Sequence, residues 1–382
     1  MYLPDHPLDG PPERRHVSTG SLPDGRLVDD LVRKAHVLYR DVNDGVLSGV
    51  YPVLAEADPA RFGIALTGAD GVVREVGDSR IPFTIMSISK PMVFALACEA
   101  LGIAMVRRLV GVNATGLPFN SAQAVERARD GRTNPMVNPG AIATTSLAPG
   151  SWPQDRWDWL ADGLSRFAGR RLELDDDTLA SARATNFRNR ALAMLLQEAG
   201  ALAGDSLAAV DLYTMQCCLS VTAVDLATMG ATLADGGVNP VTGERVVSAA
   251  VARATLAVMG ISGMYEGSGD WLLDVGLPGK SGISGGVVAV SPGKGALGVF
   301  SPPLDADGNS VRGQLVARLL ASELGLDLLG SEPTQGSGLD RHDSSAAGQA
   351  GSEDGATQDA EGDRDHRRGG GHQCVEARGI AV

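Results

Sequence analysis

Segments with strand-forming character occur at both ends of the apolar part of this chain, and a long helical stretch separates them. Residues 61–67 and 72–76 flank a turn at 68–71, which predicts a hairpin, and residues 285–290 and 296–300 repeat this pattern around a turn at 291–295. Residues 27–40 and 311–324 carry apolar side chains at helical spacing. This order predicts an α/β (α+β) fold, in which both ends of the chain build one antiparallel sheet flanked by helices.

Composition sets the predicted domain boundaries. Residues 24–85 and 221–330 are expected to form the α/β sandwich domain, and residues 86–220 an inserted all-helical domain with good helix formers such as those of 188–203. Residues 1–23 are rich in proline, and residues 331–382 consist mainly of small, polar and acidic residues. Both ends are therefore predicted to be disordered, the first as an arm and the second as an acidic tail.

The charge of the chain excludes some classes of partner. A net charge of −13 argues against nucleic acid, because phosphate backbones are bound by clustered lysine and arginine. No apolar run approaches the ~18 residues that a membrane span needs, and Met1 to His16 lack the apolar stretch of a signal peptide. We therefore expect a cytoplasmic protein without a membrane partner. Four irregularly spaced cysteines predict neither a disulfide framework nor a cysteine zinc site.

Histidine and lysine are both scarce where chemistry would need them. No histidine occurs between Val37 and Arg341, so a Ser-His-Asp triad, a Cys-His pair or a histidine metal centre is hard to build in the body of the chain. Only four lysines accompany twenty-nine arginines. Because a lysine, unlike an arginine, can lose its proton near neutral pH, each lysine is a candidate base.

The segment Ser87-Ile88-Ser89-Lys90 is a Ser-x-x-Lys motif ahead of an apolar helix at residues 92–101. Three residues are nearly one helical turn, so the Ser87 hydroxyl and the Lys90 amine are expected on the same face. Pro91 belongs in the first turn of a helix, which places Ser87 at the positive end of the helix dipole. A desolvated lysine beside such a serine can act as its base. The alternative is an N-cap serine with an unrelated surface lysine.

A second lysine favours the catalytic interpretation. Lys280, Ser281 and Gly282 open the predicted strand at 285–290 and resemble the Lys-Thr/Ser-Gly element that accompanies Ser-x-x-Lys in penicillin-recognising enzymes. Tyrosine is the remaining candidate proton carrier. Tyr213 and Tyr265 lie between the helical stretch and this element, and Tyr51 precedes Ser87. Each tyrosine, taken alone, is more typical of a half-buried core residue than of a proton carrier.

Several segments together resemble the serine-dependent bacterial glutaminases over about residues 25 to 328. They occur in the order of that family: residues 82–90, Phe119-Asn120-Ser121, residues 134–142, Arg188-Asn189, Tyr213 and residues 280–282. The resemblance implies a β-lactamase-like, penicillin-binding-like fold. It also implies hydrolysis of L-glutamine to L-glutamate and ammonia without metal or cofactor, in a homo-oligomer that we expect to be a homotetramer.

Site roles follow from the resemblance position by position. Ser87 would be the nucleophile and Lys90 its base, with Tyr213 or Tyr265 relaying a proton to the leaving ammonia. The amide N–H groups of Ser87 and Ile283 would form the oxyanion hole. The implied substrate-binding residues are Ser87, Asn138, Asn189, Tyr213, Tyr265 and Ile283, and the implied supporting residues are Tyr51, Lys280, Ser281 and Gly282.

The chain departs from the family at a few positions. Ala182 follows Ser181 where the family usually has a glutamate that holds the α-amino group of glutamine, and Met86 stands where glutamine is usual. Losing the partner of a buried ammonium costs ~1–3 kcal/mol, which predicts a raised KM or a changed substrate. Two rival hypotheses follow: a related serine hydrolase of another amide or of β-lactams, and a scaffold that binds a metabolite without turning it over.

Overall fold

The computed structural model describes residues 20–330. The predicted tail at 331–382 and the first nineteen residues of the predicted arm lie outside this range. Helix α1 (Gly25–Tyr39) begins after the N-cap Asp24, whose side chain accepts a hydrogen bond from the Arg26 amide. Its buried residues recur at helical spacing, so the predicted amphipathic helix is confirmed.

Strands from both ends of the chain build one five-stranded antiparallel sheet in the order β2-β1-β8-β7-β6. Its members are β1 (Gly63–Gly68), β2 (Val73–Gly77), β6 (Gly279–Gly282), β7 (Gly286–Ser291) and β8 (Gly295–Phe300). Both predicted hairpins are confirmed, and the two ends of the chain meet where Gly63 pairs with Phe300 and Gly68 with Gly295. The predicted antiparallel sheet flanked by helices is therefore the observed fold.

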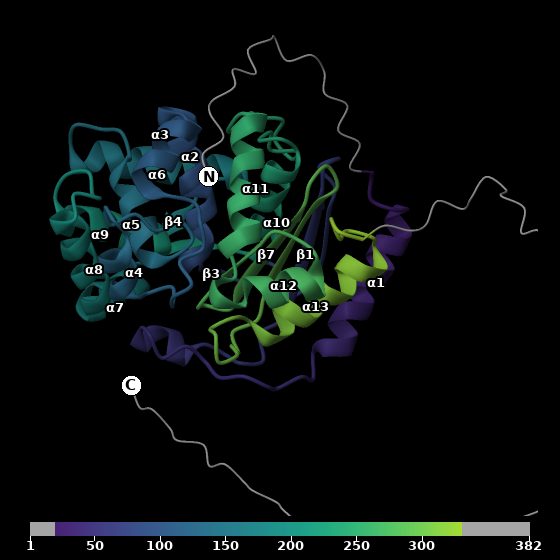
Figure 1. Ribbon diagram of the computed structural model, residues 1–382. Helices are drawn as coiled ribbons and strands as arrows, with labels where there is room; N and C mark the ends of the chain where they lie inside the picture. Colours follow the sequence, from purple (N-terminus) through teal and green to yellow (C-terminus); the bar gives the residue numbers. More distant parts are fainter. Residues whose placement is uncertain (1–19, 331–382) are drawn as a thin grey trace, which may run out of the picture. The chain divides into compact units, whose positions relative to one another are not determined.

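Helices cover both faces of this sheet (Figure 1). Alternate residues of β7 divide between two cores: Val287 and Ala289 pack with α1, α12 (Ser268–Val275) and α13 (Val311–Glu323). Val288 and Val290 instead face α10 (Ala223–Ala234), beyond which lies α11 (Ala249–Ser262). Helix α10 lies close to the sheet because Gly298 has no side chain; a Cβ there would sit 2.2 Å from the Ala223 carbonyl oxygen.

Residues 223–275 are mostly helical, because apolar side chains around α10 and α11 bury these helices between the sheet and the other helices. One expectation for the second half of the chain was wrong. Lys280, Ser281 and Gly282 do not open the strand at 285–290. They form β6, which turns at residues 283–285 and pairs antiparallel with β7, with Lys280 opposite Val288.

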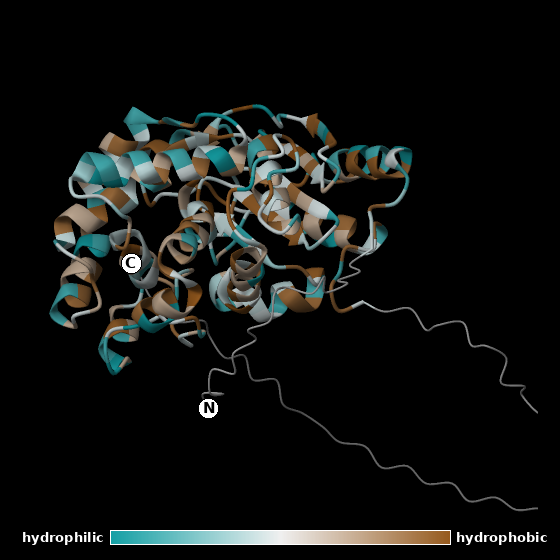
Figure 2. Ribbon diagram, turned by 90° about the horizontal axis from the view of Figure 1, so that it is seen from above, coloured by the Kyte–Doolittle hydropathy of each residue, from teal (hydrophilic) through white to brown (hydrophobic). Residues whose placement is uncertain are grey.

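The middle of the chain is helical, and a small three-stranded sheet pairs segments from its two ends and its interior. That sheet has the order β3-β5-β4, with β3 at Phe83–Thr84, β4 at Glu173–Leu174 and β5 at Leu219–Val221. The helices of this region are α2 (Ser89–Leu101), α3 (Ile103–Val110), α4 (Ala122–Arg127), α5 (Asn138–Ser146), α6 (Pro153–Ala168), α7 (Asp176–Thr185), α8 (Phe187–Glu198) and α9 (Ser206–Cys217). In helices at the edge of the view in Figure 2, hydrophilic residues alternate with hydrophobic ones. The predicted division into two domains stays a prediction.

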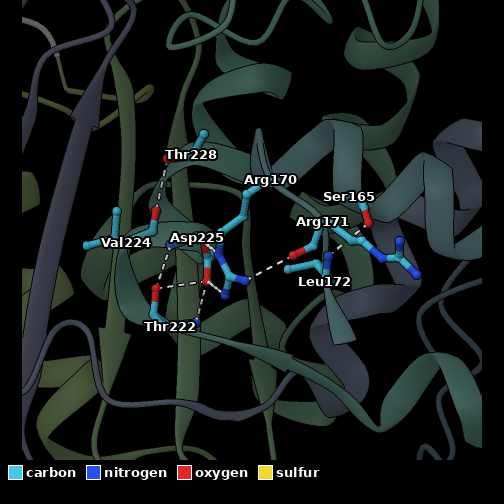
Figure 3. Close-up of polar contacts among 8 residues, drawn as sticks. All are labelled: Ser165, Arg170, Arg171, Leu172, Thr222, Val224, Asp225 and Thr228. Atoms are coloured by element: carbon cyan, nitrogen blue, oxygen red, sulfur yellow. Dashed lines mark hydrogen bonds and ion pairs between the residues drawn. The ribbon is translucent and has the colours of Figure 1, made fainter. Parts of the chain in front are cut away.

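A charged cluster joins the loop after α6 to the start of α10 (Figure 3). Arg170 donates to both carboxylate oxygens of Asp225, from Nε at 2.8 Å and from Nη2 at 2.6 Å. The Thr222 amide and hydroxyl also donate to Asp225, at 2.7 and 2.8 Å, which forms a capping box at the first turn of α10. The Asp225 side chain is only 6% exposed, so its charge is buried but fully matched.

Candidate active site

Ser87 lies on a tight turn directly before α2. The turn is a short 3₁₀ helix at Met86–Ile88, and α2 begins two residues after the serine, so Ser87 lies near the positive end of the α2 dipole as predicted. Met86 has a φ of 48°, which non-glycine residues rarely adopt. Such strain persists only where the surroundings enforce it, and it is concentrated at functional sites.

Lys90 is buried beside this turn, with 1% of its surface exposed. Its Nζ donates to Asn138 Oδ1 at 2.7 Å and to the Met136 carbonyl at 3.2 Å. Burial, which disfavours the charged form, lowers the pKa of Lys90 to about 7, and the nearby Cys217 thiol opposes this shift. Lys90 is therefore a lysine that can be neutral and basic near physiological pH.

Lys280 extends from β6 toward the same region. Its Nζ lies 3.6 Å from the centre of the Tyr265 ring and donates to the Ser281 carbonyl at 3.0 Å. Burial, together with the positive charge of Lys90, holds the pKa of Lys280 well below its usual value. Both lysines are thus brought to one place, and Lys280 supports the ring of a tyrosine that contacts the serine.

Tyr265 is the residue in direct contact with the nucleophile candidate. The Ser87 side chain is close enough to oppose the effect of burial on the pKa of the Tyr265 hydroxyl, and the backbone of Tyr265 has a φ of 56°. The Lys90 Nζ lies 5.3 Å from the centre of its ring. Burial raises the pKa of Tyr265 above its usual value, so the phenol keeps its proton at neutral pH. Tyr213 lies on α9 with its hydroxyl 3.4 Å from Asn138 Oδ1, and burial raises the pKa of Tyr213 as well.

Two backbone amides near Ser87 are free to bind an oxygen atom. Neither the Ser87 nor the Ile283 N–H donates to any acceptor in the part of the chain that the structure describes. The two segments are held together by the Ser284 hydroxyl, which donates to the Thr84 carbonyl at 2.6 Å. Gly282 permits the close approach, since a Cβ there would meet the Ile85 carbonyl oxygen at 3.0 Å. Free N–H groups in this arrangement can form an oxyanion hole.

A cavity of about 130 Å³ opens beside these groups. Among the predicted site residues, its walls include Tyr51, Ser87, Asn138, Asn189, Tyr213 and Ile283. Lys90, Tyr265, Lys280, Ser281 and Gly282 lie behind this lining rather than in it. The Asn138 amide donates to Asn189 Oδ1 at 3.0 Å, which couples the two asparagines across the cavity wall.

Sequence reasoning missed several residues of the cavity wall. These are Val50, Met86, Phe119, Asn120, Thr185, Asn186, Arg188 and Cys217. Phe119, Asn120 and Arg188 belong to segments that carry the family resemblance, which was the available signal. Asn186 and Cys217 gave none, because one resembles an ordinary helix cap and the other an idle buried thiol. Arg188 is the only residue of this wall with a full charge at neutral pH.

Ala182 lies immediately behind the cavity wall. It is fully buried on α7, in a core that also contains Tyr51, Met86 and Tyr213. The wall carries no carboxylate among the described residues, so no side chain replaces the glutamate that the resemblance leads one to expect at position 182.

Residues 20–330 contain neither a candidate metal cluster nor a candidate membrane span. No group of three or more histidine, cysteine, aspartate or glutamate side chains in that range could hold a metal ion. No helix described there is long and apolar enough to cross a membrane.

The fold and the site together define a class. The antiparallel sheet is flanked by helices. Ser87 lies directly before the buried helix α2, Lys90 lies one turn later, and Lys280 lies on strand β6. This is the β-lactamase-like architecture.

Comparisons with known proteins narrow the class to one family. A family model described as Glutaminase matches residues 45–329. Glutaminase 2 of Yersinia pestis is 56% identical over 318 residues, covering 83% of this chain and 94% of that protein. A glutaminase of Mycobacterium ulcerans is 44% identical, covering 79% and 94%.

Solved structures agree with the sequence matches. A probable glutaminase, ybaS, superposes with a TM-score of 0.79 at 42% identity, covering 81% of this chain and all of that one. A Bacillus glutaminase superposes with a TM-score of 0.72 at 32% identity, covering 79% and 99%. The chain belongs to the glutaminase family.

Proposed function

We propose that this protein hydrolyses L-glutamine to L-glutamate and ammonia through an acyl-enzyme on Ser87. The observation that carries this proposal is the contact of Ser87 with Tyr265, next to a buried lysine whose pKa lies at about 7. Family membership supports the substrate, and one similar solved structure, 42% identical over 80% of this chain, is of a protein called Mglu in its glutamate form.

In the first half of the reaction the Ser87 Oγ attacks the side-chain carbonyl carbon of glutamine. Neutral Lys90 accepts the serine proton, and the Tyr265 hydroxyl stays in contact with the serine during this step. The N–H groups of Ser87 and Ile283 stabilise the negative oxygen of the tetrahedral intermediate. When the intermediate collapses, the C–N bond breaks, the proton held by Lys90 passes through Tyr265 to the leaving nitrogen, and ammonia departs.

In the second half a water molecule replaces ammonia. Its oxygen attacks the ester carbon while Lys90 again takes a proton. The ester bond to Ser87 then breaks, the proton held by Lys90 returns to Ser87 Oγ, and glutamate is released. Asn138 holds the Lys90 amine through Oδ1 and is coupled to Asn189, so the base and the cavity wall form one connected unit. The Tyr213 hydroxyl donates to the same Oδ1 atom of Asn138.

The test is ammonia and glutamate release from L-glutamine by the purified wild-type protein and by Ser87→Ala. We expect turnover by the wild type and none by the variant. Adding hydroxylamine should divert the acyl-enzyme to the γ-hydroxamate of glutamate. Turnover that survives Ser87→Ala, or no hydroxamate from an active wild type, would rule out the acyl-enzyme on this serine.

A second candidate is an amide hydrolase that does not require the α-ammonium group of its substrate. The charge of the cavity wall favours it, because Arg188 can attract a carboxylate but no described wall residue carries a negative charge that would attract an ammonium. The comparison of kcat/KM for L-glutamine and for 4-carbamoylbutanoate, which lacks the ammonium, decides between the two. A stable adduct of penicillin on Ser87 would instead favour a β-lactam hydrolase, and glutamine that raises thermal stability without product release would favour a binding scaffold.

The proposal extends to assembly and location. We place the enzyme in the cytoplasm as a homotetramer that needs no cofactor; the free, buried thiols of Cys98, Cys217 and Cys218 suit a reducing compartment. Light scattering of the purified protein and fractionation of the cells that produce it test these two points.

A further inference from the structure

Three uncharged side chains form a buried hydrogen-bonded chain beneath the Ser87 turn. Gln216 on α9, Ser89 on α2 and Thr145 on α5 are all fully buried. The Gln216 Nε2 lies 3.2 Å from Ser89 Oγ, and the Thr145 hydroxyl lies 2.8 Å from Gln216 Oε1. Side chains from three helices therefore meet at one point of the core, where an unmatched polar group would be costly.

The directions of these hydrogen bonds follow from the atoms available. The Ser89 hydroxyl has one hydrogen, which it donates to the Met86 carbonyl at 2.8 Å, so its oxygen must accept from the Gln216 amide. This fixes the orientation of the Gln216 amide and turns its Oε1 toward Thr145. The chain thus runs from Gln216 through Ser89 to the Met86 carbonyl.

The end of this chain lies on the peptide group that precedes the nucleophile. The Met86 carbonyl and the Ser87 N–H belong to one planar peptide unit and point in opposite directions. Anchoring the carbonyl in the core therefore aims the N–H outward, to the side where the Ser87 amide lacks an acceptor and lines the cavity. Met86 has a φ of 48°, which costs about 1–2 kcal/mol, so this orientation needs support.

We propose that Gln216 is a positioning residue for the reaction: through Ser89 it holds the Met86–Ser87 peptide group so that the Ser87 N–H binds the oxyanion. This inference rests on the proposed acyl-enzyme function. It concerns the transition state, because the oxyanion forms only there, and it predicts a loss in kcat rather than in substrate binding.

The variant Gln216→Met keeps the length of the side chain and removes its donor. Ser89→Ala removes the intermediate hydroxyl and leaves a smaller side chain, so it remains informative if Gln216→Met does not fold. Thr232→Val is the matched control, since Thr232 is also fully buried and hydrogen-bonded, to carbonyls of α6 and α10 far along the chain from Ser87. Kinetics on L-glutamine and urea unfolding are measured for all three.

We expect kcat to fall about 10- to 100-fold in Gln216→Met and in Ser89→Ala, with KM changed less than about threefold and with Thr232→Val near wild type. Equal kcat in the variants and the wild type, or a loss confined to KM, overturns the positioning role. So does a fall in kcat that Thr232→Val shares at equal loss of stability. Ammonia release by the wild type and its absence in Ser87→Ala show separately whether the underlying function holds; no turnover by the wild type overturns both.

Discussion

Two polar clusters in this molecule differ in whether their buried ionisable groups are paired with a group of opposite charge. At the start of α10, Asp225 is paired with Arg170 and capped by Thr222, so the buried carboxylate has a partner of opposite sign and further donors. Beside Ser87, Lys90 and Lys280 are buried with neutral oxygens and the Tyr265 ring as neighbours, and burial lowers the pKa of both lysines.

This difference indicates that the Asp225 cluster serves stability and that the Lys90 cluster serves chemistry. A carboxylate beside Lys90 would hold its proton and raise its pKa, as Asp225 raises the pKa of Arg170. Without one, the Lys90 amine can alternate between its two protonation states near neutral pH. The active site gives up the stability of a paired charge to obtain a base.

The largest expected effect comes from removing that base. Lys90→Met replaces the amine with an apolar chain of similar length, so we expect kcat to fall about 10³-fold while the protein stays folded, because no buried charge is left behind. Ammonia release and thermal unfolding measure the two effects. Lys34→Met, at an exposed lysine of α1 that lies 3.7 Å from Glu323, is the control and should change neither. Turnover within tenfold of wild type would show that another group is the base.

The pH dependence tests the same contrast in the unmodified protein. Since only neutral Lys90 accepts a proton, and its pKa is about 7, kcat/KM should be constant well above pH 7 and fall about tenfold per pH unit well below it. Between about pH 7 and the usual lysine pKa, the unfolded chain holds a proton on this lysine that the folded chain lacks. The free energy of unfolding should therefore rise with pH across that window and gain nothing from this lysine below it. A profile flat from pH 5 to 8 would contradict the assignment.

The paired cluster should respond in stability alone. Asp225→Asn leaves Arg170 and Thr222 without the carboxylate, and we expect about 2–3 kcal/mol lower free energy of unfolding, less than a fully buried pair because the Arg170 side chain is 46% exposed. Asp211→Asn, at the half-exposed Arg183–Asp211 pair with its 2.8 Å contact, should cost less than about 1 kcal/mol. Urea unfolding measures both. Equal losses in the two variants would remove the distinction between them.

The smallest expected effect concerns the charge of the cavity wall. Ala182→Glu adds a carboxylate behind a wall that has none, and we expect KM for L-glutamine to fall by up to about tenfold through pairing with the ammonium. Ala182→Gln has the same shape without the charge and should leave KM near that of the wild type. Steady-state kinetics on both variants, with circular dichroism as a folding check, decides this; an equal change in both would mean that volume rather than charge matters.

Many helices and strands of the fold could be predicted from the sequence, because the sequence patterns that indicate them are local. Both β-hairpins, α1 and α13 follow from apolar spacing and turn residues, and the start of α2 follows from Pro91. The expectation that Ser87 and Lys90 share one face follows from their spacing of one helical turn. These features depend on residues that are close in the chain, where periodicity and turn chemistry apply.

The remaining features depend on contacts between distant segments. The contact of Tyr265 with Ser87 joins residues on different elements, and Gln216 resembles any buried glutamine until Ser89 is found beside it. The strand β6 was misplaced because its four residues carry almost no periodicity of their own, and only pairing with β7 makes them a strand. Tertiary contacts of this kind cannot be derived from spacing along one segment.

The pairing of β1 with β8 has a consequence for how the chain folds. The hairpin of β1 and β2 is complete once residue 77 has been synthesised. The other edge of β1 stays unpaired until residues 295–300, which form β8, have been synthesised. During that interval an apolar strand presents unpaired amides and carbonyls to other chains, which is the situation that favours aggregation. Because the contacts that close the sheet are so distant in sequence, we expect slow folding that ends only after the last strand has emerged, so that chains truncated before β8 should be found in the insoluble fraction.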